Sequence, residues 1–131
     1  MTHWTEKYLG MKHSREFDCA AFVRLVLTHE LEISPDFPQL DWKRTEPDVI
    51  RDIAMEFSIE VPEPSDYNGV LMKVQGNRRS MGSHIGLYVT VNKQVYILHS
   101  IIRMGSVLTP LIHLPRLQME IISYHEWITS N

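Results

Sequence analysis

The sequence predicts an α+β domain in which N-terminal helices pack on an antiparallel β-sheet of about five strands. Three observations lead to this prediction. Apolar residues recur with helical spacing as far as residue 57, short strand-forming runs follow from residue 70 onward, and Pro62 and Pro64 separate the two halves. Helices followed by a run of strands with short connections are typical of α+β proteins.

Length and composition narrow the class of protein. The chain has 131 residues, a net charge of −3 and one cysteine, so we expect residues 1–131 to form a single domain. A lone cysteine excludes an internal disulfide and a zinc site of paired thiolates. Because the net charge is negative, we expect no nucleic-acid partner. The spacing of the histidines does not suit a metal site, so we expect no bound metal. We also expect no cofactor. With no apolar run long enough for a membrane span and no signal sequence, we expect synthesis in the cytoplasm.

The first helix is expected to begin at Asp18 or Cys19 and to end within residues 32–38. Asp18 is a favourable N-cap, because its carboxylate can accept hydrogen bonds from the first free backbone N–H groups. Three apolar residues with helical spacing form one face of this helix: Phe22, Leu25 and Val26.

A second helix is expected over residues 46–57. Thr45 and Asp48 resemble a capping box, and Pro47 is tolerated in the first turn of a helix. The apolar stripe of this helix consists of Val49, Ile50, Ile53, Ala54 and Phe57. The residues that follow, 58–68, contain both separating prolines and are expected to lie outside any helix or central strand.

The second half of the chain is expected to form strands joined by short loops. The expected strands are Val70–Gln75, Ser83–Val91, Gln94–Ile101, Met104–Leu108 and Gln118–Tyr124. Asn92 and Lys93 are expected to make the tight turn of a hairpin, so that Val91 faces Gln94.

This hairpin predicts that two histidines lie together. With Val91 opposite Gln94, Gly86 lies opposite His99, and His84 is the diagonal neighbour of His99 on the same face. Gly86 has no side chain to stand between the two imidazoles. Each histidine alone is more typical of a half-exposed strand residue, and only the joint pattern favours a functional pair.

Cys19 is a candidate nucleophile because the first turn of a helix favours a thiolate. The alternative is a small buried hydrophobic residue, which is the ordinary role of a lone cysteine. An imidazole that takes the thiol proton, and a third polar group that orients the imidazole, would complete a nucleophilic site. Cys19, His84 and His99 could supply these three parts.

Four segments together resemble a known family. They are Tyr8–Gly10, Phe17–Val23, Ser83–Val89 and Tyr96–Ser100. Their order and composition are similar to those of the NlpC-type papain-like cysteine peptidases, which are bacterial and phage cell-wall hydrolases. The resemblance implies a papain-like fold with Cys19 as nucleophile, His84 as general base and His99 as the residue that orients it. It also implies a role for Tyr8 near the oxyanion or the substrate.

The same resemblance implies what the protein acts on. It implies a cysteine peptidase or amidase that hydrolyses peptide bonds of peptidoglycan stem peptides, most similar to phage tail-assembly members. We therefore expect a location in the virion or its tail and contacts with other tail proteins. Ala20 and Ala21 replace the Ser-Gly that usually follows the family's cysteine, which removes a hydroxyl near the nucleophile.

The sequence is also compatible with two other functions. A non-catalytic structural module of a phage tail would have the same fold and catalyse no reaction. A deamidase or acyltransferase would use the same cysteine chemistry on a different bond. Arg78 and Arg79, near Lys73, form a local basic cluster. They belong to a solvated loop or grip a substrate carboxylate.

Overall fold

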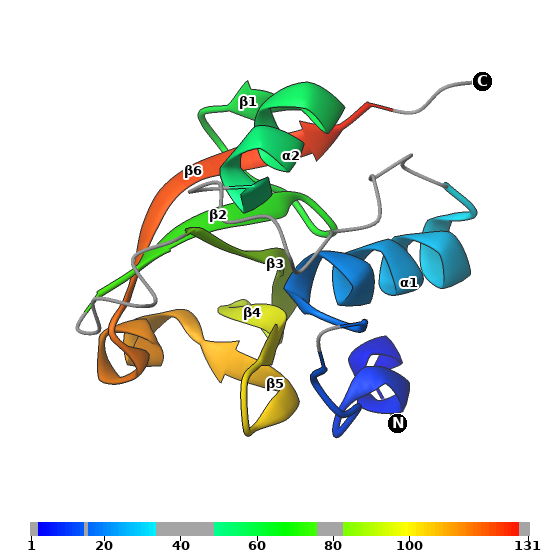
Figure 1. The fold of residues 1–131 in the computed structure, drawn as a ribbon, viewed down its shortest axis with the longest axis vertical. Coiled ribbons are helices and arrows are strands. Elements are labelled where there is room, and N and C mark those ends of the chain that lie inside the picture. Colours follow the sequence, from blue (N-terminus) through cyan, green and yellow to red (C-terminus); the bar gives the residue numbers. More distant parts are fainter. Residues whose placement is uncertain (1–2, 15, 34–48, 76–82, 129–131) are drawn as a thin grey trace.

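The structure is a computed structural model that describes residues 3–14, 16–33, 49–75 and 83–128. Within these ranges, two helices and six strands make up the fold, with two short 3₁₀ helices beside them (Figure 1). In chain order they are η1 (Trp4–Tyr8), α1 (Cys19–Leu31), α2 (Val49–Phe57), β1 (Ser58–Val61), β2 (Gly69–Val74), β3 (Ser83–Val91), β4 (Gln94–Ile101), β5 (Gly105–Pro110), η3 (Leu111–Leu117) and β6 (Met119–Trp127).

The six strands form one sheet in the order β1-β6-β2-β3-β4-β5, and all neighbouring strands are antiparallel. The final strand β6 crosses the molecule as a long curved ribbon and inserts between β1 and β2 (Figure 1). The predicted α+β class is therefore confirmed. The five expected strands correspond to β2 through β6, with bounds that differ by at most three residues.

The sixth strand, β1, is missing from the sequence-based prediction. It has four residues, lies at the edge of the sheet and pairs only with β6. Pro62 follows it directly, which is a position where proline is tolerated because the strand has ended. A four-residue run beside prolines carries too little periodicity to be recognised, and only the pairing with β6 makes it a strand.

Helix α1 begins where the sequence predicts. The side chain of Asp18 accepts a hydrogen bond from the backbone N–H of Ala21 at 3.0 Å, so Asp18 is the N-cap and Cys19 the first helical residue. The helix ends at Glu32, whose left-handed backbone (φ 55°) stops the helical path. For α2, the expected capping residues Thr45, Pro47 and Asp48 lie outside the described residues.

The sheet has a helix-covered face and an opposite face with its own apolar core. α1 and α2 contribute to a core that includes Ile85, Leu87 and Leu98 of the central strands. The opposite face carries Ile97 and other residues that pack beneath η3. Because successive side chains of a strand point to opposite faces, these assignments decide which face each functional side chain occupies. Within the part of the chain that the structure describes, no helix is both long and apolar enough to cross a membrane.

Candidate functional site

The β3–β4 hairpin has the register that the sequence predicts. The paired positions run from Val91 opposite Gln94 to Leu87 opposite Leu98. The turn residues Asn92 (φ 51°) and Lys93 (φ 68°) both adopt left-handed backbone angles, as a tight two-residue hairpin turn requires. This register, with alternation along the strands, brings His84 and His99 to the same face of the hairpin.

The two strand histidines meet as expected. Nε2 of His84 lies 2.9 Å from Nδ1 of His99, and the two rings are inclined at 63°. His99 is fully buried and His84 is 8% exposed. On its other side, Nε2 of His99 lies 2.9 Å from Oγ1 of Thr109 on β5. The result is a continuous buried chain of contacts across three strands, whose last member the sequence analysis did not identify.

Burial keeps the imidazoles of His84 and His99 uncharged near neutral pH. It lowers the pKa of His99 to about 4. It also lowers the pKa of His84 well below its usual value, and the neighbouring His99 and His13 lower it further. A neutral imidazole is the form that can accept a proton, so His84 is in the state that a general base requires.

Gly86 lets the two strands approach at the histidine pair. A Cβ atom there would stand 2.7 Å from Cγ2 of Ile97 and 3.0 Å from Cβ of His99. We expect Gly86→Ala to destabilise the protein by about 1–3 kcal/mol and to displace the His99 ring, because the strand must shift. Gly10→Ala is the control, since no atom lies within 4 Å of a Cβ added there. Its only expected cost is that alanine must adopt the left-handed backbone (φ 80°) of Gly10. Urea unfolding with histidine-ring NMR measures both effects, and an undisturbed ring in Gly86→Ala would contradict the expectation.

Cys19 is buried, and its thiol is protonated. Burial raises the pKa of the Cys19 thiol to about 12, and the charge of Asp18 raises it too. Hydrogen bonds from the backbone N–H groups of Ile85, Ala20 and Cys19 itself act in the opposite direction. The helix terminus therefore favours the thiolate in the predicted direction, but its effect is too small to ionise the thiol. The amides do point at the sulfur, but desolvation outweighs them.

The thiol and the imidazoles reach the same part of β3 from different sides. Cys19 belongs to the core beneath α1 and receives a hydrogen bond from the amide of Ile85, the residue next to His84. Alternation along the strand directs His84 to the opposite face. The β3–β4 pairing stops at Leu87 opposite Leu98, so the start of β3 pairs only with β2. Among the described residues, the hydrogen bonds of His84 include its bond to His99 and none to the thiol.

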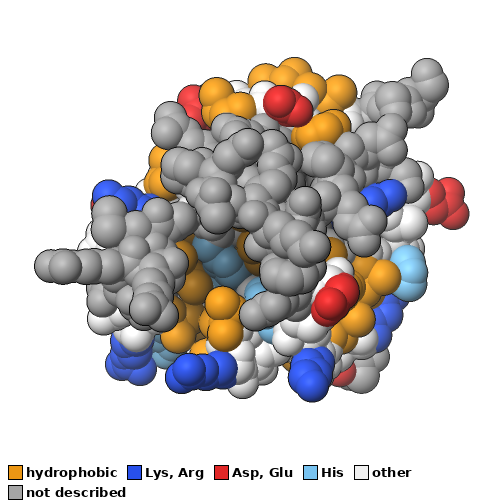
Figure 2. Space-filling view, in the orientation of Figure 1, with side chains coloured by type: hydrophobic (Ala, Val, Ile, Leu, Met, Phe, Trp, Pro, Cys, Tyr) orange, Lys and Arg blue, Asp and Glu red, His pale blue; other side chains and the backbone are white. Residues whose placement is uncertain are grey.

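Figure 2 shows histidine side chains at the bottom of a hollow in one face of the molecule, with hydrophobic side chains on its border. A third histidine, His13, lies close enough to His84 to lower its pKa, and no role was predicted for it from the sequence. Nδ1 of His13 lies 2.9 Å from Oγ of Ser100, and the ring interacts electrostatically with both His84 and Asp18. Its isolated position before α1 gives no periodic signal that could have identified it.

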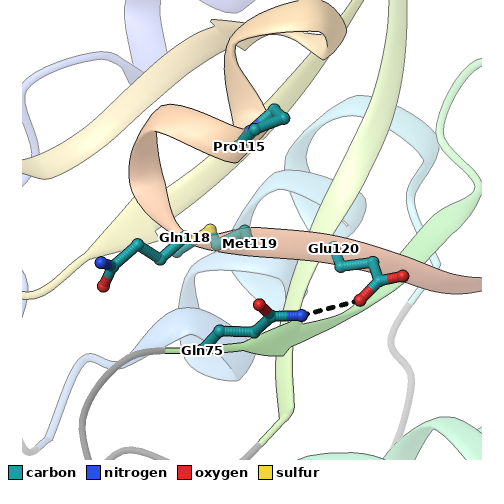
Figure 3. A pocket seen from close by; sticks show the side chains of 5 residues that line it. All are labelled: Gln75, Pro115, Gln118, Met119 and Glu120. Atoms are coloured by element: carbon teal, nitrogen blue, oxygen red, sulfur yellow. Dashed lines mark hydrogen bonds between the residues drawn. The ribbon is translucent and has the colours of Figure 1, made fainter.

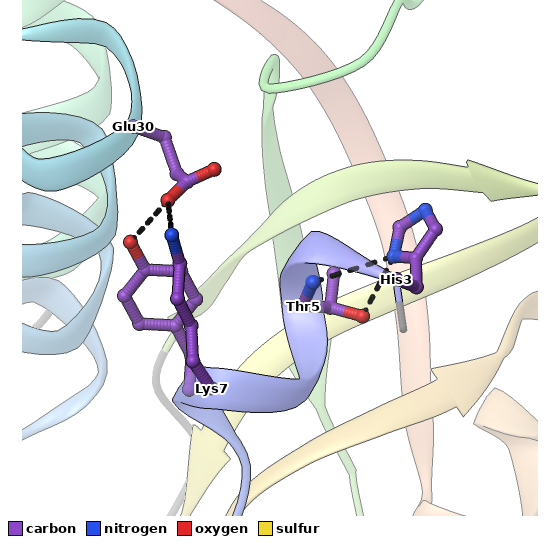
Figure 4. Close-up of polar contacts among 5 residues, drawn as sticks. His3, Thr5, Lys7 and Glu30 are labelled. Atoms are coloured by element: carbon purple, nitrogen blue, oxygen red, sulfur yellow. Dashed lines mark hydrogen bonds and ion pairs between the residues drawn. The ribbon is translucent and has the colours of Figure 1, made fainter. Parts of the chain in front are cut away.

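Tyr8 does not reach the thiol. Its hydroxyl donates to Oε2 of Glu30 at 2.5 Å, and Lys7 forms an ion pair with the same oxygen at 2.6 Å (Figure 4). Burial and the Glu30 carboxylate raise the pKa of the Tyr8 hydroxyl. Cys19 and Glu30 are separated by 11 residues of α1, or about 16 Å along the helix axis. The structure therefore holds the Tyr8 hydroxyl near the C-terminal end of α1, whereas the thiol is at its start.

Arg78 and Arg79 lie outside the described residues, and Lys73 is exposed on β2. No group of three or more His, Cys, Asp or Glu side chains within the described ranges is placed to hold a metal ion.

A separate hollow of about 400 Å³ lies beside the end of β2 and the start of β6. It is lined by Gln75, Pro115, Gln118, Met119 and Glu120 (Figure 3). Nε2 of Gln75 donates to Oε2 of Glu120 at 2.8 Å, so the one carboxylate of this lining already has a partner. None of the Cys19, His84 and His99 side chains lines it.

Comparison with known proteins gave no relative. No family model, no curated protein and no solved structure matches the chain. The site itself and the sequence motifs therefore carry any proposal of function.

Proposed function

We propose that the protein is a cysteine-dependent hydrolase of papain-like type, with Cys19 as nucleophile, His84 as general base and His99 as the residue that orients His84. The observation that carries the proposal is the buried chain of 2.9 Å contacts from His84 through His99 to Thr109. A neutral imidazole is the form that can take the proton of a thiol, and His84 is next in the chain to Ile85, whose amide contacts the sulfur.

The proposed reaction begins from a neutral thiol and a neutral imidazole. His84 takes the proton of Cys19 as the sulfur attacks the carbonyl carbon of the substrate, and the carbonyl oxygen becomes an oxyanion. The backbone N–H of Cys19 supplies a hydrogen bond to that oxyanion. The imidazolium of His84 then donates its proton to the leaving amine, which breaks the C–N bond and leaves a thioester. A water molecule, deprotonated by His84, hydrolyses the thioester and restores the thiol.

We propose peptide bonds of peptidoglycan stem peptides as the substrate and a phage tail as the setting. This part of the proposal rests on the four motif segments that resemble the NlpC-type hydrolases, and contacts with other tail proteins are proposed on the same basis. The small basic cluster at Arg78 and Arg79 is a candidate for holding a stem-peptide carboxylate.

The test is an incubation of wild type and Cys19→Ala with purified muropeptides, followed by mass spectrometry of the products. A new amine and a new carboxylate from one peptide bond, present only with wild type, would support the proposal. Equal product from both proteins, or none from wild type across muropeptides of several wall types, would contradict it.

A non-catalytic module with the same fold is the second candidate, and one observation favours it. The thiol is 7% exposed and protonated, and no hydrogen bond links it to His84 among the described residues. An unused core cysteine would have the same surroundings.

Alkylation of Cys19 by iodoacetamide at pH 7 separates the two candidates. In a hydrolase, His84→Ala should slow alkylation about tenfold or more, because the imidazole no longer takes the thiol proton. His113→Ala, at a partly buried position of η3, is the control for loss of a histidine. Equal rates for wild type and both variants would favour the non-catalytic module.

A further inference from the structure

Thr109 is the inner end of the imidazole chain. It lies on β5 opposite Ile97, two residues from Val107, the direct partner of His99. The Thr109 side chain is therefore the diagonal neighbour of His99 on the same face of the sheet, and its hydroxyl lies 2.9 Å from Nε2 of His99. It is 8% exposed, so little solvent competes for this contact.

A count of protons determines the direction of each hydrogen bond when His84 is charged. An imidazolium at His84 has hydrogens on both ring nitrogens, so its Nε2 must donate to Nδ1 of His99. Nδ1 of His99 must then be an acceptor. His99 is buried and has a pKa of about 4, so it stays neutral and has its single proton on Nε2. Among the residues that the structure describes, the partner of that proton is the hydroxyl oxygen of Thr109.

The uncharged state allows two patterns, and only one suits catalysis. If Thr109 accepts from His99, Nε2 of His84 is protonated and its Nδ1 has a free lone pair, ready to accept a proton. If Thr109 donates to His99, every bond of the chain reverses and Nδ1 of His84 is protonated, so it cannot act as a base. The first pattern needs no rearrangement when His84 becomes charged.

We propose that Thr109 is a positioning residue that accepts the Nε2 proton of His99 and thereby keeps Nδ1 of His84 unprotonated as the base. The choice between the two tautomers rests on the proposed function, whereas its measurement by NMR requires no activity. Thr109 acts through His99 and does not touch the substrate.

The test compares wild type with Thr109→Ser, which keeps the hydroxyl, and Thr109→Val, which keeps the shape and removes it. Long-range ¹H–¹⁵N NMR of the histidine rings reports directly which nitrogen of each neutral ring has the proton. Wild type and Thr109→Ser should have His99 protonated on Nε2 and His84 protonated on Nε2. Thr109→Val should populate the reversed tautomers, because a buried N–H would otherwise have no acceptor.

Rates give the second readout. Thr109→Val should lower the rate of muropeptide cleavage about tenfold or more, while Thr109→Ser stays within about twofold of wild type. Urea unfolding of each variant confirms that the comparison is between folded proteins.

A wild-type His99 protonated on Nδ1 would overturn the proposal without any variant. Unchanged tautomers in a folded Thr109→Val would overturn it as well. If wild type cleaves nothing but the tautomers respond to Thr109→Val as expected, the proposed function fails and the assignment of Thr109 stands.

Discussion

Cys19→Ala is expected to lower the rate of stem-peptide cleavage by at least about a thousandfold while leaving the fold intact. The proposed reaction forms its covalent intermediate on this sulfur, and no second cysteine exists to replace it. The cysteine occupies a small buried position at the start of α1, where alanine is well tolerated. The measurement is the rate of product formation at substrate concentrations far below saturation.

Two further variants make this result interpretable. Cys19→Ser keeps a hydroxyl at the same place and should be almost as inactive, because a neutral imidazole activates an alcohol less readily than a thiol. His84→Gln should lose activity to a similar extent, since the three groups act as a unit and their losses do not add. Substantial activity in a folded Cys19→Ala would show that the chemistry occurs elsewhere.

Acid should destabilise the protein steeply below pH 6.5. Burial lowers the pKa values of His84, His99 and His125, so the unfolded chain binds more protons than the folded one as the pH falls. Their contribution to stability is complete above pH 6.5 and declines toward the folded-state pKa values. For His99, with a folded pKa of about 4, the loss by pH 4 is about 3 kcal/mol. His84 and His99 together predict a slope of about 2.7 kcal/mol per pH unit where both respond.

Urea unfolding at a series of pH values between 7 and 4.5 measures this slope. His99→Gln removes one of the responding groups and should reduce it by about 1.4 kcal/mol per pH unit. His113→Gln is the matched control for the loss of one histidine from the chain. A free energy of unfolding that stays constant from pH 7 to 5 would contradict this expectation, because it would mean that the imidazoles take up protons in the folded protein as readily as in the unfolded chain.

The network around His125 shows why acid acts on more than the candidate site. Nδ1 of His125 lies 2.9 Å from Oγ of Ser58, and its Nε2 lies 2.7 Å from Oγ of Ser123. The Ser58 hydroxyl donates to the carbonyl of Ala54, so it accepts from Nδ1, and Ser123 donates to Nε2. Protonation of Nε2 would remove the lone pair that accepts the hydrogen bond from Ser123. This loss would occur beneath the end of α2.

The hairpin and the first helix were predictable because their information is local. Asp18 caps α1 through a bond to an amide three residues away, and Asn92 and Lys93 set the β3–β4 register within a two-residue turn. A correct register, together with alternation along the strands, was sufficient to bring His84 and His99 together. Edge strand β1 was not predictable in this way, because its only strand partner is β6 at the far end of the chain.

The site was predictable only in part. Thr109 contacts His99 because β5 pairs with β4, and no spacing in the sequence reveals that its hydroxyl meets a ring nitrogen. His13 approaches the same region through Ser100, 87 residues further along the chain. Tyr8 was expected near the thiol, but the contact with Glu30 holds its hydroxyl at the other end of α1.

Local sequence alone determined the α+β class, the start of α1 and the pairing of the two strand histidines, because caps, tight turns and strand alternation act over a few residues. The protonation of Cys19, the position of Tyr8 and the extension of the imidazole chain to Thr109 were determined only by tertiary packing. The physical reason is that burial and long-range contacts set them. Desolvation of the thiol outweighs the helix amides, and the partners of Tyr8 and His99 come from elements that only the folded sheet brings together.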